Sequence, residues 1–180
     1  EIVSADHQNK PDVASNITRQ WYDQDGVDLI VDVPTSSAAL AVSEVTREKD
    51  KVFINSGAGS TALTGAQCSP NTIHWTYDTY ALAQGTGGAM VEQGNTDWYF
   101  ITADYAFGHS LEEETTKVVE AAGGKVLGTA RHPFPGTDFS SYLLQAQASG
   151  ADVIGLANAG GDTVNAIKQA AEFGITQAGQ

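Results

Sequence analysis

Three consecutive hydroxyl side chains, Thr35, Ser36 and Ser37, follow an apolar run of strand length and precede a helical pattern. Hydroxyl oxygens at a helix start can accept hydrogen bonds from the first N–H groups of the helix. The same N–H groups carry a partial positive charge and can bind an anion. A single cap needs only one hydroxyl. The stretch therefore predicts either a helix cap or a site for an anionic ligand group.

A second loop, NSGAGSTALTG at 55–65, follows the next apolar run. Glycines such as Gly57 and Gly59 let a backbone approach a ligand closely, and Ser60 adds a hydrogen-bond donor. The spacing is not the GxGxxG of a dinucleotide-binding turn, and no suitably placed acidic residue follows a complete first strand–helix unit. The loop predicts either contacts with a ligand or a purely structural series of turns.

Two later loops offer different chemistry. Tyr105 and Phe107, in the loop 102–110, could stack on a ligand, and the tyrosine could also hydrogen-bond to it. The alternative is that they fold back onto the core, which we expect more readily of Phe107. Further on, Asn158 offers both a donor and an acceptor, whereas Asp162 is expected to cap the following helix.

These loops lie between apolar runs and helical patterns that alternate along the whole chain. Such alternation predicts an α/β fold with parallel sheets and helices on both faces. Ligands of parallel sheets bind beyond the carboxyl ends of the strands, which is where the four loops would lie. The predicted strands are 2–5, 27–33, 52–55, 72–75, 98–102, 125–129 and 152–157.

The segment SPNTIHWTYDTY, at 69–80, interrupts this alternation. A Pro-Asn turn leads into a short strand with little room before the next helix. We interpret the segment as a crossover, which predicts one lobe at 1–76 and a second at 77–180.

Composition and spacing argue against several classes of function. The net charge is −13, and the nine Lys and Arg residues are too few to line a nucleic-acid groove. The histidines lack metal-ligand spacing, no GxSxG motif is present, and Cys68 has no evident base. We therefore expect no catalytic centre, no metal and no cofactor.

The ordered set of motifs resembles the type 1 periplasmic solute-binding proteins of ABC transporters, in the branched-chain amino-acid (Leu/Ile/Val) binding family. The resemblance spans essentially the whole chain. It is carried by DHQNKPDVA (6–14), GVDLIVDVPTSSAALAV (26–42), KVFINSGAGSTALTG (51–65), ITADYAFG (101–108), GTDFSSYLLQAQASGADVI (136–154) and AIKQAAEFGI (166–175).

This resemblance implies a two-lobed type I fold whose lobes close over a small molecule, without catalysis, and a membrane permease that receives the cargo. It also implies a periplasmic or other extracytoplasmic location. The implied ligand is a small carboxylate, either a branched-chain or other amino acid or an aromatic acid such as a benzoate. The implied ligand contacts are Thr35, Ser36, Ser37, Gly57, Ala58, Gly59, Ser60, Thr79, Tyr80, Tyr105, Phe107 and Asn158.

Members of this family are roughly twice as long as this chain, so the resemblance implies a fragment. We expect the family's first strand and helix, and everything after the helix near 161–174, to lie outside it. The strand at 1–5 should then lack its inner neighbour and leave backbone hydrogen bonds open.

Two other functions remain open. A cytosolic ligand-sensing effector domain could share this fold, because fold alone does not decide function. A nucleotide-dependent oxidoreductase would need the sequence GAGSTA, within 57–62, to hold a pyrophosphate.

Overall fold

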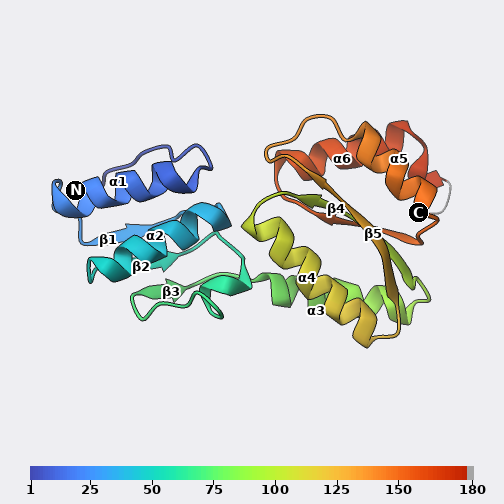
Figure 1. Cartoon of the computed structure of the whole chain (residues 1–180), viewed down its shortest axis with the longest axis horizontal. Helices are drawn as coiled ribbons and strands as arrows, with labels where there is room; N and C mark the ends of the chain where they lie inside the picture. Colours follow the sequence, from blue (N-terminus) through green and yellow to red (C-terminus); the bar gives the residue numbers. More distant parts are fainter. Residues whose placement is uncertain (178–180) are drawn as a thin grey trace. The chain divides into compact units, whose positions relative to one another are not determined.

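A computed structural model describes residues 1–177 of the chain. These residues belong to two compact units, Glu1–Asp78 and Thr79–Gln180 (Figure 1). Both are built from parallel strands and helices, which confirms the predicted α/β class. No helix among residues 1–177 is long and apolar enough to cross a membrane.

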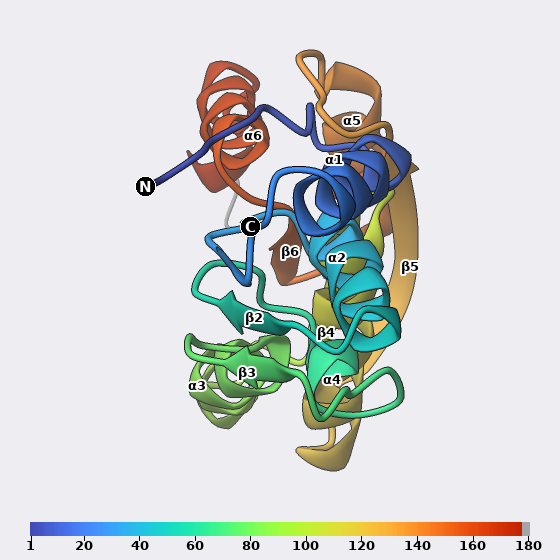
Figure 2. The ribbon, with the colours of Figure 1, turned by 90° about the vertical axis from the view of Figure 1, so that its left-hand side faces the viewer.

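The first unit contains a three-stranded parallel sheet in the order β1–β2–β3. Helix α2 packs on β2 and β3, and α1 packs along α2, as Figure 2 shows. Pro11 occupies the first turn of α1, where its missing N–H costs nothing. The elements are α1 (Pro11–Asp23), β1 (Leu29–Val31), α2 (Ser36–Glu48), β2 (Val52–Asn55), the 3-10 turn η1 (Thr61–Leu63) and β3 (Thr72–His74).

The core of this unit lies on one face of the sheet. Ile30 pairs in register with Phe53, and both are buried with Val42 and Val45 of α2. Successive side chains of a strand point to opposite faces. Leu29, Val31, Val52 and Ile73 are accordingly exposed on the other face, so the expectation of helices on both faces does not hold for the described part of this sheet.

The second unit contains a parallel sheet in the order β5–β4–β6. Helices α3 and α4 lie on one face, and α5 and α6 on the other, with the central strand β4 between them (Figure 1). The elements are α3 (Thr79–Glu92), β4 (Asp97–Ala103), α4 (Ala106–Ala121), β5 (Lys125–His132), α5 (Ser140–Ser149), β6 (Val153–Ala157), α6 (Gly161–Glu172) and the 3-10 turn η2 (Ile175–Gln177).

Strand β4 is apolar on consecutive residues because both of its faces are covered. Trp98 and Phe100 join a cluster with Val91 of α3 and Val119 of α4. Tyr99 and Ile101 point the other way, into the cluster formed with α5 and α6. The prediction of a strand covered by helices on both faces is confirmed here.

The predicted strand at 2–5 is wrong, because residues 1–6 lie outside any helix or strand. A hollow of about 870 Å³ is lined by this segment, by α1 and by β1. A β-strand requires a hydrogen-bonded neighbour, and this segment has none within the described residues. The other six predicted strands are confirmed, five of them with shifts of their ends.

Candidate functional site

In the first unit, the loops that follow β1 and β2 lie against each other. The backbone N–H of Ser60 donates to Oγ of Ser36 at 3.2 Å, and both residues are buried. A Cβ added to Gly57 would lie only 3.0 Å from Cα of Pro34. The glycine permits this close approach. The structure thus brings the start of α2 and the predicted loop at Gly57–Ser60 together.

Asn55, which is not among the residues predicted from the sequence to bind a ligand, shapes this second loop. The side chain is fully buried at the end of β2. Its Nδ2 donates to the carbonyl of Ala58 at 2.6 Å, and its Oδ1 accepts from the N–H of Ala58 at 3.0 Å. The signal in the sequence is an amide at the carboxyl end of an otherwise apolar strand. Such an amide can take the place of backbone partners in a turn.

The hydroxyl groups hold this region together, but they do not cap α2 as a simple N-cap would. Thr35 occupies the N-cap position without a side-chain capping bond, and its Oγ1 instead donates to Oδ1 of Asn9 at 2.5 Å. Ser60 caps η1 by accepting from the N–H of Ala62. Ser37 is half-buried and also has a partner within the chain. A tertiary contact therefore orients the side chain of Thr35, whereas a local contact orients that of Ser60.

In the second unit, Asn158 follows the end of β6 and is 6% exposed. Its Oδ1 accepts from Oγ1 of Thr163 at 2.7 Å, and its Nδ2 lies 3.4 Å from Nε2 of His132. His132 ends β5 and is 1% exposed. The spacing of the histidines argues only against a metal site, so His132 is not among the residues predicted from the sequence.

Asp162 does not cap α6, and that prediction is wrong. Gly160 occupies the N-cap position, whereas Asp162 is the second residue of the helix and is buried. Its Oδ1 accepts from the N–H of Gly136 at 3.1 Å, and its Oδ2 has no hydrogen-bond partner among residues 1–177. Because α6 begins at Gly161, Asp162 lies beyond the N-cap position, and its carboxylate holds the loop after β5 instead.

The aromatic side chains of the loop after β4 differ in exposure. Tyr105 is half-buried at the N-cap position of α4 and stacks on Phe134, with ring centroids 4.1 Å apart and planes 9° apart. Phe107 is 6% exposed, in agreement with the interpretation that it folds onto the core. Tyr105 therefore offers the larger accessible aromatic surface.

The two candidates at the start of α3 also differ. Thr79 is fully buried, and its Oγ1 lies 2.6 Å from Oγ of Ser110 in α4. This bond ties the first turn of α3 to α4. Tyr80 is 54% exposed. Of the two side chains, only that of Tyr80 is directly accessible to a solute.

The residues predicted to contact a ligand supply neutral donors and acceptors in both units. Among residues 1–177, no three His, Cys, Asp or Glu side chains are grouped so that they could hold a metal ion. Backbone N–H groups, hydroxyls and an amide surround the two loop regions instead. Such groups can bind a carboxylate by hydrogen bonds and the partial charge of a helix start.

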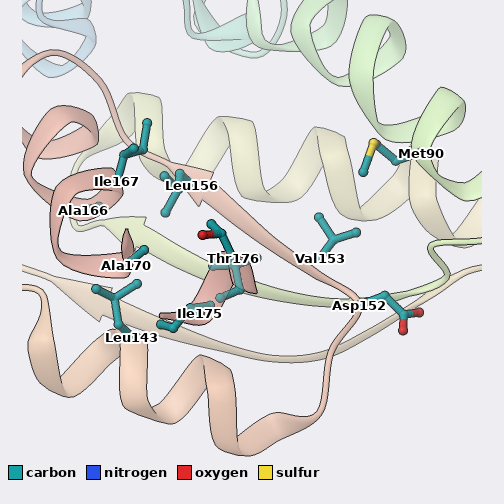
Figure 3. Close-up of a pocket in the computed structure, with 11 residues that line it drawn as sticks. Met90, Leu143, Asp152, Val153, Leu156, Ala166, Ile167, Ala170, Ile175 and Thr176 are labelled. Carbon is teal, nitrogen blue, oxygen red and sulfur yellow. The ribbon is translucent and has the colours of Figure 1, made fainter. Parts of the chain in front are cut away.

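A separate apolar hollow of about 230 Å³ lies against β6 in the second unit (Figure 3). Met90, Leu143, Leu156 and Ile167 are among its lining residues, and none of the predicted site residues is. The carboxylate of Asp152, at its edge, already accepts from the N–H groups of residues 96 and 97. This hollow lacks convergent polar groups and is a poor site for an anion.

Comparison with known families gives a match over the whole sequence. Residues 1–180 match the family described as periplasmic binding protein. A search of curated proteins found no match.

Solved structures of periplasmic and ABC transporter binding proteins also match this chain. A periplasmic binding protein from Burkholderia mallei is 59% identical, with a TM-score of 0.96 over 98% of this chain and 47% of that one. A branched-chain amino-acid ABC transporter ligand-binding protein from Burkholderia xenovorans LB400 is 38% identical, with a TM-score of 0.73 over 97% and 47%.

A third solved structure is an ABC transporter solute-binding protein from Rhodopseudomonas palustris in complex with benzoate. It is 25% identical, with a TM-score of 0.90 over 96% of this chain and 48% of that one. The chain thus spans about half the length of these solved relatives.

Proposed function

The chain belongs to the periplasmic binding protein family, and we propose that it binds a small carboxylate in the periplasm for an ABC importer. In this proposal the protein leaves its ligand chemically unchanged and delivers it to a membrane permease. The family match supports this role, as do solved relatives that are named as ABC transporter binding proteins. None of the comparisons favours an oxidoreductase or a cytosolic sensor.

One observation carries the choice of ligand class. The Ser60–Ser36 bond holds the glycine loop at the first turn of α2, so that backbone N–H groups and hydroxyls converge there. Neither the stretch 34–39 nor the loop 55–65 contains a Lys or Arg. A helix start of this kind suits an anionic group. Within this proposal the ligand contacts are Thr35, Ser36, Ser37, Gly57, Ala58, Gly59, Ser60, Tyr80, Tyr105 and Asn158. The buried Thr79 and Phe107 would hold the neighbouring loops in place behind these contacts.

Two subclasses of carboxylate fit this proposal. A branched-chain amino acid is favoured by the printed description of the Burkholderia xenovorans relative, and an aromatic acid by the benzoate bound to the Rhodopseudomonas palustris relative. The half-buried Tyr105, with Phe134 stacked on it, could contact the ring of an aromatic acid.

A thermal-shift screen of the intact protein would test the ligand class. The probes are benzoate, 4-hydroxybenzoate, leucine, isoleucine and NAD⁺. A probe at 100 times its Kd should stabilise the protein by about 2.7 kcal/mol. Saturable stabilisation by one of the carboxylates supports the proposal. Stabilisation by NAD⁺ alone, or by none of the probes at millimolar concentration, would contradict it.

The mechanism that the family suggests is hinge closure. A ligand shifts a protein toward the closed conformation only through its differential affinity for that conformation. Small-angle X-ray scattering of the intact protein, with and without the probe that binds, should show a smaller radius of gyration in the bound state. An unchanged radius at saturation would exclude closure.

A further inference from the structure

The ring of His132 has a defined hydrogen-bonding pattern. Its Nδ1 lies 2.9 Å from the carbonyl oxygen of Pro133, which can only accept, so Nδ1 carries a proton. Its Nε2 faces Nδ2 of Asn158, which can only donate, so Nε2 must accept. His132 is therefore neutral in this arrangement, and its Nε2 lone pair holds the amide of Asn158.

The oxygen end of the Asn158 amide faces the hydroxyl of Thr163, which can either donate or accept a hydrogen bond. Oδ1 of Asn158 accepts from the hydroxyl of Thr163, but a hydroxyl can also accept from an amide N–H. If His132 gains a second proton, Nε2 becomes a donor and repels Nδ2 of Asn158. Rotating the amide by half a turn restores both hydrogen bonds.

The carboxyl group of Asp162 lies close to the ring of His132. Oδ2 of Asp162 is 3.7 Å from Nδ1 of His132 and has no hydrogen-bond partner among residues 1–177, and both side chains are at least 96% buried. An unpaired carboxylate oxygen in a protein interior is costly. Proton uptake by His132 would convert this contact into a buried ion pair.

We propose that His132 is a positioning residue whose protonation state sets the orientation of the Asn158 amide. The neutral ring holds Nδ2 toward itself, and the protonated ring holds Oδ1. Because the amide has two different ends, rotation exchanges the donor and the acceptor that Asn158 presents elsewhere. The consequence for ligand binding rests on the proposed function, in which Asn158 contacts the carboxylate.

The other groups around His132 leave Asp162 as its main electrostatic partner. The ring of Tyr142, in α5, lies 5.9 Å away, and that of Phe139, at the N-cap of α5, packs edge-on at 4.7 Å. On the backbone side, the N–H of Asp104 donates to the carbonyl of His132. The carboxylate of Asp104 itself pairs with the exposed His109.

The neighbouring side chain on β5, Arg131, points away from this cluster toward Glu112 of α4. Their charges belong to the more exposed side of the strand. The buried cluster thus contains one carboxylate, one imidazole and one amide, together with the Thr163 hydroxyl that supports the amide.

NMR of the intact, isotope-labelled protein tests this proposal without any ligand. The ring of His132 and the side-chain NH₂ of Asn158 are followed from about pH 8 to pH 5, the range in which histidines change charge. We expect the two sets of resonances to change together. Asp162→Asn keeps the shape but removes the carboxylate next to the ring, and should change the pH response of both sets of resonances together.

Asp104→Asn is the matched control, because it removes a carboxylate that pairs with a different histidine. It should leave the pH response of the His132 and Asn158 resonances unchanged. The proposal would be overturned if the resonances of Asn158 did not change together with those of His132. It would also be overturned if Asp162→Asn gave the same pH response as the wild type. The wild-type protein alone shows whether the resonances of Asn158 change with those of His132, even if the variant does not fold.

Benzoate affinity measured across the same pH range separates this proposal from the proposed function. An affinity change that follows the Asn158 transition, and moves with it in Asp162→Asn, supports the positioning role in binding. A benzoate affinity that stays constant across the pH range in which the Asn158 resonances change would overturn the positioning role in binding. If none of the carboxylate probes binds, the proposed function fails, whereas the NMR titration still decides whether His132 orients Asn158.

Discussion

The backbone N–H of Ser60 donates to Oγ of Ser36, and this single 3.2 Å bond joins the loop after β2 to the first turn of α2. Both residues are buried, so neither the N–H nor the hydroxyl can readily exchange its partner for water. The bond fixes the place where the glycine loop meets the helix start. Substitutions at four positions test this region and the two cores.

Ser36→Ala removes the acceptor and leaves a buried N–H unsatisfied. We expect the free energy of unfolding to fall by about 1–3 kcal/mol in urea denaturation. The matched control is Ser141→Ala, an exposed serine in the first turn of α5, which should change it by less than about 0.5 kcal/mol. Equal stability of the two variants would show that the Ser60 bond contributes nothing.

Gly57→Ala tests the close approach of the two loops. The new Cβ would lie 3.0 Å from Cα and 3.2 Å from Cβ of Pro34, and a backbone atom cannot swing aside. We expect a loss of about 1–3 kcal/mol of stability, typical of overpacking, and weaker binding of the carboxylate that stabilises the wild type. Gly85→Ala, in an exposed turn of α3 with no atom within 4 Å, should instead raise stability by about 0.5–1 kcal/mol. A Gly57→Ala variant as stable as wild type would mean that the loops separate freely.

Gly155→Ala tests the packing of β6 against β4. A Cβ at this position would lie 2.5 Å from Cε1 of Phe100, whose ring is 2% exposed and enclosed by the core. We expect a loss of about 1–3 kcal/mol by urea denaturation. Gly161→Ala is the control, since the first residue of α6 has open space around it and should tolerate the methyl group. A loss of similar size in both variants would point to backbone effects rather than to Phe100.

Tyr22→Phe tests the alkaline limit of stability. Burial raises the pKa of Tyr22, although the hydrogen bond with Thr46 acts in the opposite direction. A pKa raised by folding means that the unfolded chain loses the tyrosine proton first. The contribution of Tyr22 is therefore fully present below the pKa of an unfolded tyrosine, about 10. It is lost as the pH rises through the folded value.

Urea denaturation from about pH 8 to pH 11 measures this effect. The variant should lose stability less steeply than the wild type above about pH 10, although it is less stable at pH 8 because the Thr46 bond is missing. Tyr77→Phe, at a tyrosine that is 52% exposed, should follow the wild-type curve. Identical alkaline slopes for Tyr22→Phe and wild type would refute the role of burial.

The kind and order of most elements follow from the residues alone. β2 begins and ends where the apolar run VFIN predicts, and α6 ends before Gly174, which has the positive φ of a helix stop. These features depend on residues that are near one another in the chain. The prediction of a strand at 2–5 was wrong because a strand also needs a hydrogen-bonded neighbour, which the local pattern of residues does not reveal.

The pairing of one polar group with another depends instead on the folded chain. Thr35 bonds to Asn9, 26 residues away, and Ser36 bonds to residue 60, 24 residues away. Asp162 reaches the loop at Gly136 instead of capping its own helix. A hydroxyl or carboxylate can serve equally well as a cap, a loop tie or a ligand contact. The choice depends on which donors the fold brings within about 3 Å of it, and that distance is set by the packing of whole elements.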